Sequence, residues 1–142
     1  MLRRNGIIVG VLLATFGTGV WVGVVTVGAQ RPARVLELRK YTTNAGKQDA
    51  LLQRMRQGET QLFEKHGMKG VFYSVPADAP DSQNTFIYVL SHESREAAKK
   101  SWDDFRNDAA WKSLREKSEA NGPLVAKVES IFVSPTDFSP LK

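Results

Sequence analysis

The sequence predicts an α+β domain whose antiparallel sheet carries its helices on one face. Predicted strands, the first of alternating polarity and the others largely apolar, and segments with helical spacing of apolar residues follow one another in the order strand, helix, strand, strand, helix, strand. This is the order of the ferredoxin-like βαββαβ arrangement, a four-stranded antiparallel sheet. Several of the strands are apolar on both faces, which is typical of strands covered on both sides. Two helices cover only one face, so we expect a second copy of the chain to cover the other and to complete a dimeric α+β barrel.

The first strand is predicted at residues 35–42, where the side chains alternate in polarity. Leu36 and Leu38 lie on one face, and we expect this face to meet the helices. The other face then points into the barrel, with the side chains of Glu37, Arg39 and Tyr41. Because buried charges need partners, two interpretations stay open: an internal salt-bridge network, or the polar floor of an apolar ligand pocket.

The first helix is predicted at residues 47–66, because apolar side chains recur there at helical spacing. Gly67 follows at the position where a helix often ends in a left-handed residue. Gly58 lies in mid-helix, where a glycine costs about 1 kcal/mol relative to alanine, so we expect another part of the chain to pack closely there. The second and third strands are predicted at residues 69–75 and 85–90, joined by a loop that contains two prolines.

The second half of the chain begins with two predicted helix caps. Ser94 is expected to cap a helix at residues 95–107, and Asp108 is expected to cap a further short helix. The last strand is predicted at residues 124–133 and is followed by an extended tail at 135–142.

The first part of the chain is interpreted as a targeting segment. Residues 1–29 combine a short positive start with an uncharged apolar run that ends in small residues, the layout of a secretory signal peptide cleaved before Gln30. The alternative is an uncleaved membrane anchor, because the run of about 23 residues is long enough to span a bilayer. Residues 30–33 then form a linker and residues 34–140 the domain, which we expect in the periplasm or outside the cell.

Composition excludes several classes of function. The chain has no cysteine and two histidines, so thiol chemistry, iron–sulfur clusters and cysteine-ligated metals are absent and we expect neither a metal site nor a cofactor. The formal net charge is +5, but basic and acidic residues are interspersed, whereas nucleic-acid binding needs clustered positive charge. The sequence therefore predicts no nucleic-acid partner, and a membrane partner only if the N-terminal segment is uncleaved.

Short segments spread over nearly all of residues 34–140 resemble the NIPSNAP family. They are Glu37–Thr42, Gly46–Lys47, Phe63–Gly67, Ser94–Ala97, Trp102, Phe105–Arg106, Asn121–Pro123, Lys127–Ser130 and Thr136–Pro140. Members commonly have Asp-Pro-x-Trp after the second helix, where this chain reads Asp108-Ala109-Ala110-Trp111. The resemblance implies a dimeric α+β barrel, an architecture shared with cofactor-free antibiotic-biosynthesis monooxygenases. It implies no settled reaction and no catalytic set, because members are mostly described as signalling, trafficking or binding proteins.

Few residues are candidates for chemistry. His66 is a weak candidate for a general base, but its place in the last turn of a helix favours a role at the helix end. Arg39 is a possible anchor for an anionic ligand, and three tyrosines could line the barrel interior beside it: Tyr41, Tyr73 and Tyr88. No phosphate-binding loop, dinucleotide fingerprint or Ser/His/Asp arrangement is present in the sequence.

Three functions of different classes follow from these observations. The first is a dimeric module that binds a small apolar or acidic ligand or a partner protein. The second is a cofactor-free monooxygenase or isomerase, and the third is a purely structural assembly unit. A pocket that contains a histidine or carboxylate without a charge partner would favour catalysis, whereas fully paired polar groups would favour binding or structure.

Overall fold

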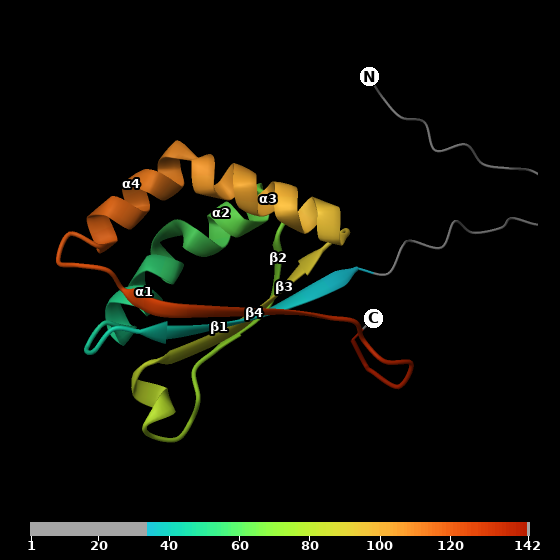
Figure 1. Ribbon diagram of the computed structural model, residues 1–142, viewed down its shortest axis with the longest axis horizontal. Helices are drawn as coiled ribbons and strands as arrows, with labels where there is room; N and C mark the ends of the chain where they lie inside the picture. Colours follow the sequence, from blue (N-terminus) through green and yellow to red (C-terminus); the bar gives the residue numbers. More distant parts are fainter. Residues whose placement is uncertain (1–33, 142) are drawn as a thin grey trace, which may run out of the picture. The chain divides into compact units, whose positions relative to one another are not determined.

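The computed structural model describes residues 34–141, which form a four-stranded antiparallel sheet with helices on one face (Figure 1). The elements are β1 (Val35–Thr43), α1 (Gln48–Arg54), the π-helix η1 (Met55–Glu59), α2 (Thr60–Lys65), β2 (Lys69–Ser74), the 3-10 turn η2 (Asp81–Gln83), β3 (Thr85–His92), α3 (Arg95–Asn107), α4 (Ala109–Ser118) and β4 (Val125–Val133). The strand order β2-β3-β1-β4 is that of the ferredoxin-like arrangement, so the predicted fold is confirmed.

The helix ends follow the predicted caps. The Ser94 side chain accepts a hydrogen bond from the backbone N–H of Ala97, and Asp108 accepts one from Ala110 at 2.7 Å. Gly67 ends α2 with a φ of 77°, a conformation that favours glycine. Within residues 34–141 no helix is both long and apolar enough for a membrane span. The predicted signal peptide or anchor and its cleavage position lie outside the described residues.

The predicted first helix is interrupted at Gly58. This residue has a φ of 152°, and the turn around it is π-helical, so the segment forms three consecutive pieces, α1, η1 and α2. A Cβ at this position would lie 3.5 Å from the Leu114 side chain, an ordinary contact. Leu114 of α4 therefore packs at this position, as expected, but the contact would tolerate a Cβ and does not by itself require glycine. Glycine is needed there because other residues rarely adopt that backbone conformation.

The two faces of β1 are the reverse of those predicted. Trp102 of α3 donates its indole N–H to Glu37, so Glu37 and the side chains that share its face point toward the helices. Leu36 and Leu38 lie on the helix-free face of the sheet. Alternation defines which residues share a face but not which face is covered, and the partners that satisfy the Glu37 carboxylate are on the helix side.

The core lies between the helices and the sheet. The fully buried Phe63 of α2 stacks on Tyr88 of β3 and packs against Phe105 of α3. The opposite face of the sheet is open in the single chain. Three apolar side chains on it are well exposed, namely Phe72 (46%), Ile131 (59%) and Val133 (38%).

Candidate ligand-binding site

A row of polar side chains follows β1 beneath the helices and begins at Glu37. The Glu37 carboxylate accepts hydrogen bonds from four side chains: Arg39 Nη1 at 2.6 Å, His92 Nε2 at 2.9 Å, Trp102 Nε1 at 2.7 Å and Ser130 Oγ at 2.6 Å. Burial alone would raise the pKa of Glu37, but these donors outweigh it and lower the pKa to about 2. Glu37 is therefore a paired structural anion.

Arg39 is the next member of the row. Its guanidinium pairs with Glu37 and lies over the ring of Trp102, with Cζ 4.1 Å from the ring centroid. Both contacts hold the side chain within the core, and Arg39 lines none of the pockets described below. Of the two interpretations left open by the sequence, the geometry favours the internal salt bridge over a ligand anchor.

Two tyrosines continue the row. Tyr88 donates its hydroxyl hydrogen to the hydroxyl oxygen of Tyr41 at 2.7 Å, and the rings meet edge to face. Burial raises the pKa of both hydroxyl groups, so they stay protonated at neutral pH. Tyr88 is a core residue with no exposed surface, whereas Tyr41 also reaches the wall of a pocket.

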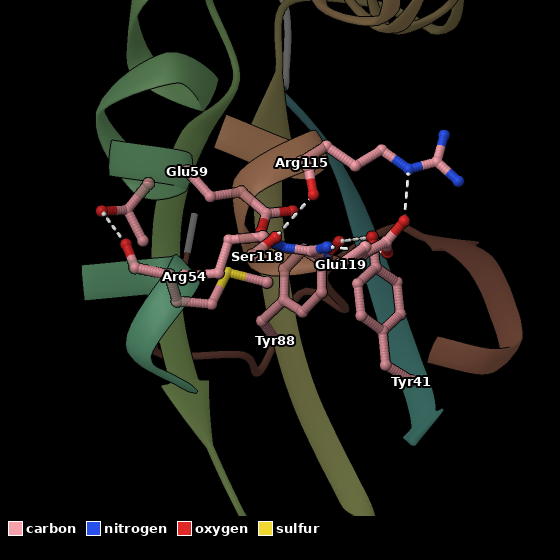
Figure 2. Close-up of polar contacts among 9 residues, drawn as sticks. Tyr41, Arg54, Glu59, Tyr88, Arg115, Ser118 and Glu119 are labelled. Carbon is pink, nitrogen blue, oxygen red and sulfur yellow. Dashed lines mark hydrogen bonds and ion pairs between the residues drawn. The ribbon is translucent and has the colours of Figure 1, made fainter. Parts of the chain in front are cut away.

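The helical end of the row is an ion-pair network around Arg54 (Figure 2). Arg54 Nε pairs with Glu59 at 2.7 Å and its Nη1 with Glu119 at 3.1 Å, while Arg115 Nε pairs with Glu119 at 2.9 Å. Figure 2 shows Arg54 between the two carboxylates, with the rings of Tyr41 and Tyr88 beside them. The network joins α1, η1 and the end of α4 over the core.

Sequence reasoning predicted none of the residues of this ion-pair network as site residues, and Glu59 is the clearest omission. It is buried, and burial raises its pKa even though Arg54 beside it acts in the opposite direction. Glu59 follows Leu51 and Met55 by eight and four residues, so regular helical spacing already puts it on their buried face. That spacing was the available signal, and in the π-helical turn Glu59 pairs at 2.7 Å with Arg54, five residues before it.

The largest pocket described, which we call the edge pocket, has a volume of about 440 Å³. It opens between the first helical segment and the β2–β3 side of the sheet. Its walls are mostly apolar, with a few polar side chains among them: Leu52, Met55, Arg56, Thr60, Gln61, Tyr73, Ser74, Val75 and Phe86. A volume of this size and a lining of this kind are usual for small-molecule sites.

Two further pockets lie toward the other edge of the sheet. The network pocket, about 250 Å³, is bounded by Tyr41, Arg54 and Glu59 together with residues of α4 and β4. The α3 pocket, about 380 Å³, lies between α3 and β4 and has Glu37 on its wall. Among residues 34–141, no group of three or more His, Asp or Glu side chains is arranged to hold a metal ion.

Comparison with known proteins identifies the family of this chain. The profile of the NIPSNAP family matches residues 36–140. The chain belongs to the NIPSNAP family. A comparison with curated proteins finds no match.

Solved NIPSNAP structures share the fold of this domain. Two NIPSNAP family proteins from Agrobacterium tumefaciens superpose with TM-scores of 0.68 and 0.67, at 21% and 18% identity. The matches cover 82% and 80% of this chain and 97% of each relative. A NIPSNAP-like domain protein from Burkholderia xenovorans has a TM-score of 0.66 at 16% identity, over 77% of this chain and 90% of its own. At these identities the likeness establishes the fold and not the ligand.

The predicted site residues of this NIPSNAP domain do not surround one cavity. Tyr73 lines the edge pocket, Tyr41 lines the network pocket, and Arg39 and Tyr88 lie in the core between the pockets. His66 lines none of the three pockets described. Its Nε2 lies 2.7 Å from Asp108, the residue that caps α4, so the geometry favours a role at the junction of two helices.

Proposed function

We propose that this NIPSNAP domain is a binding module for a small ligand with an apolar body and an acidic or polar end, held in the edge pocket. The observation that carries the proposal is the shape and chemistry of that pocket. Met55 and Phe86 close its inner side, and the ring of Tyr73 forms a further wall. Arg56, an exposed cation on the wall, has no ion-pair partner among the described residues and is placed to meet an acidic group.

Binding is favoured over catalysis by the state of the carboxylates. The edge pocket contains no carboxylate and no histidine. The carboxylates on the walls of the other pockets are paired: Glu37 with Arg39, and both Glu59 and Glu119 with Arg54. A general base needs a pKa suited to its task and a free path to the substrate, and these groups are occupied.

Decanoate is a suitable probe for the edge pocket, with decanol as its uncharged counterpart. We expect saturable binding of decanoate by calorimetry, using the protein purified from cells that express the full chain. Tyr73→Ala removes a pocket wall and should weaken binding about tenfold, a loss of about 1.4 kcal/mol. Arg56→Gln should remove the preference for decanoate over decanol.

The matched control is the neighbouring residue on β2. Phe72 lies on the opposite face of the sheet from Tyr73, because successive side chains of a strand alternate. Phe72→Ala should therefore leave decanoate binding unchanged. Equal losses in Tyr73→Ala and Phe72→Ala, or no saturable binding to the unaltered protein, would contradict the proposal.

The proposed module includes a second copy of the chain. The helix-free face of the sheet exposes Phe72, Ile131 and Val133, which are costly to leave in water. A two-fold related copy can cover this face with the same residues. Light scattering of the purified protein tests the proposal, since a stable monomer would contradict it.

Export of the module is proposed from the N-terminal segment alone. The support is the uncharged apolar run at residues 6–29, together with its small residues before Gln30. N-terminal sequencing of protein from the native host should find Gln30 as the first residue. Recovery of an intact Met1 in the membrane fraction would favour the anchor instead.

One observation favours a second candidate, cofactor-free oxygenation of an aromatic substrate. Glu59 is buried beside the network pocket and has a raised pKa, as a general base of such a reaction would need. Its ion pair with Arg54 opposes this use. Oxygen-dependent turnover of an aromatic substrate that is abolished in Glu59→Gln would overturn the binding proposal in favour of this one.

A further inference from the structure

The α3 pocket has a chemistry different from that of the edge pocket. It is bounded by Glu37, Arg95, Lys99, Trp102, Arg106 and Phe132. It lies beside β4, whereas the edge pocket lies beside β2, and these strands are the two opposite edges of the sheet. The two pockets can therefore be tested separately.

Three cations reach this pocket from one helix. Arg95, Lys99 and Arg106 follow one another in α3 at spacings of four and seven residues, so they lie on the same face of the helix. Read along the sequence, these charges are interspersed with acids and indicate only a solvated surface. In the folded chain the acids Glu96, Asp103 and Asp104 are not among the residues that line the pocket.

The charges around the pocket do not cancel. Arg106 is paired with Asp103, but neither Arg95 nor Lys99 forms an ion pair with any residue of the described domain. The positive charge of Arg95 contributes to lowering the pKa of the adjacent Glu96, but the two side chains do not form an ion pair. Glu37, the carboxylate on the pocket wall, already accepts four hydrogen bonds.

Two aromatic rings help to hold the side chains of this cationic pocket in place. The guanidinium of Arg95 lies over the ring of Phe132, with Cζ 3.9 Å from the centroid. The indole N–H of Trp102 is held at 2.7 Å by Glu37, which keeps its ring on the pocket wall. A cation held over a ring loses less conformational freedom when it binds an anion than a free side chain would lose.

We infer that the α3 pocket binds an oxyanion, a phosphate or carboxylate group carried by a small organic molecule. Arg95 and Lys99 supply the charge that has no ion-pair partner among residues 34–141, and Arg106 joins them when its pair with Asp103 opens. A volume of about 380 Å³ leaves room for an organic body beside the oxyanion. This site is additional to the edge pocket and does not depend on it.

The test uses phenyl phosphate, benzoate and the uncharged benzyl alcohol as probes, in calorimetry at low salt with protein from cells that express the full chain. We expect saturable binding of at least one of the two anions and none of benzyl alcohol. Tighter binding of phenyl phosphate assigns the site to phosphates, and tighter binding of benzoate assigns it to carboxylates. Lys99→Gln and Arg95→Gln should each lower the affinity for the anion about tenfold.

Lys100→Gln is the matched control. Lys100 neighbours Lys99 on the same helix but is paired with Asp104 and does not line the pocket. Its substitution should change anion affinity less than about twofold. Equal losses in Lys99→Gln and Lys100→Gln, or no saturable anion binding at about 10 mM, would overturn the inference. Tyr73→Ala, which removes a wall of the edge pocket, should leave anion binding intact. The proposal for the edge pocket and the inference for the α3 pocket can therefore be contradicted separately.

Discussion

At the scale of single residues, Glu37 is the group on which the interior of this domain most depends. Its carboxylate is buried, carries a negative charge at neutral pH and is bonded to a cation, an imidazole, an indole and a hydroxyl. A buried charge with such partners contributes little beyond its cost of burial, but removal of the charge leaves its partners unsatisfied. Glu37 therefore acts as a structural centre.

Glu37→Gln should lower the free energy of unfolding by about 3 kcal/mol at pH 7, because an amide cannot accept from four donors and leaves Arg39 unpaired. Denaturant unfolding measures this loss. Glu116→Gln, at an exposed position on α4, is the control and should change stability by less than about 0.5 kcal/mol. A similar small effect of both substitutions would contradict the assigned role.

The same residue predicts a dependence of stability on pH. The pKa of Glu37 falls from an ordinary value of 4.5 to about 2 on folding. Its stabilising contribution is therefore fully present above pH 4.5 and is lost as the pH falls through 4.5 toward 2. Thermal unfolding between pH 6 and pH 2 should show a steeper acid loss for the unaltered protein than for Glu37→Gln. Parallel curves would argue against a charged Glu37 in the fold.

At the scale of elements, the sequence and the structure predict opposite effects on stability for a substitution in the π-helical turn η1. Helical propensity predicts that Gly58→Ala stabilises a regular helix by about 1 kcal/mol. The structure predicts the opposite sign, a loss of about 1–3 kcal/mol, because the φ of 152° is strained for alanine. Urea unfolding of Gly58→Ala beside the adjacent, exposed Gln57→Ala decides between these signs. A gain in stability for Gly58→Ala would mean that η1 is a regular helix.

The elements were predictable where local patterns define them. Alternation placed the first strand and short apolar runs placed the other three, and the helix caps at Ser94 and Asp108 follow from side chains that accept backbone N–H groups. The covered face of β1 was not predictable from β1 alone. Leu36 and Leu38 form an apolar face that looks better suited to burial than the polar row on the opposite face. That choice depends on partners from β3, β4 and α3, which are distant in sequence.

The candidate site was predictable only in part for the same reason. Tyr73 was predicted to line the interior of a dimeric barrel, and it lies instead on the helix side of the sheet, at the wall of the edge pocket. Helical spacing from Leu51 and Met55 already puts Glu59 on the buried face, but its pairing with Arg54 depends on η1. Spacing likewise puts the cations of α3 on one helix face, whereas the pocket that they line depends on the position of α3 over the sheet. The local sequence pattern therefore gives the faces of the helices but not the partners that they meet.

At the scale of the whole molecule, the open face of the sheet predicts the behaviour of substitutions on β4. Ile131 pairs with Leu38 and lies on the helix-free face, whereas Val128 pairs with Tyr41 and lies on the helix side. The two side chains are similarly exposed, at 59% and 47%. Ile131→Asp should convert the proposed dimer to a monomer, because a charge on a buried interface lacks a partner, and Val128→Asp should not. Light scattering that finds the same oligomeric state for both variants would contradict the proposed interface.

The bonds of Glu37 also bear on how the chain folds. Its partners His92, Trp102 and Ser130 lie 55, 65 and 93 residues further along the chain. A hairpin or a single strand–helix unit therefore leaves this carboxylate exposed to water or buried without most of its donors, and a one-residue slip of β1 would bring Leu36 or Leu38 to its place. One acidic side chain thus makes incomplete or misregistered assemblies less favourable than the finished sheet, and so adds to the cooperativity of folding.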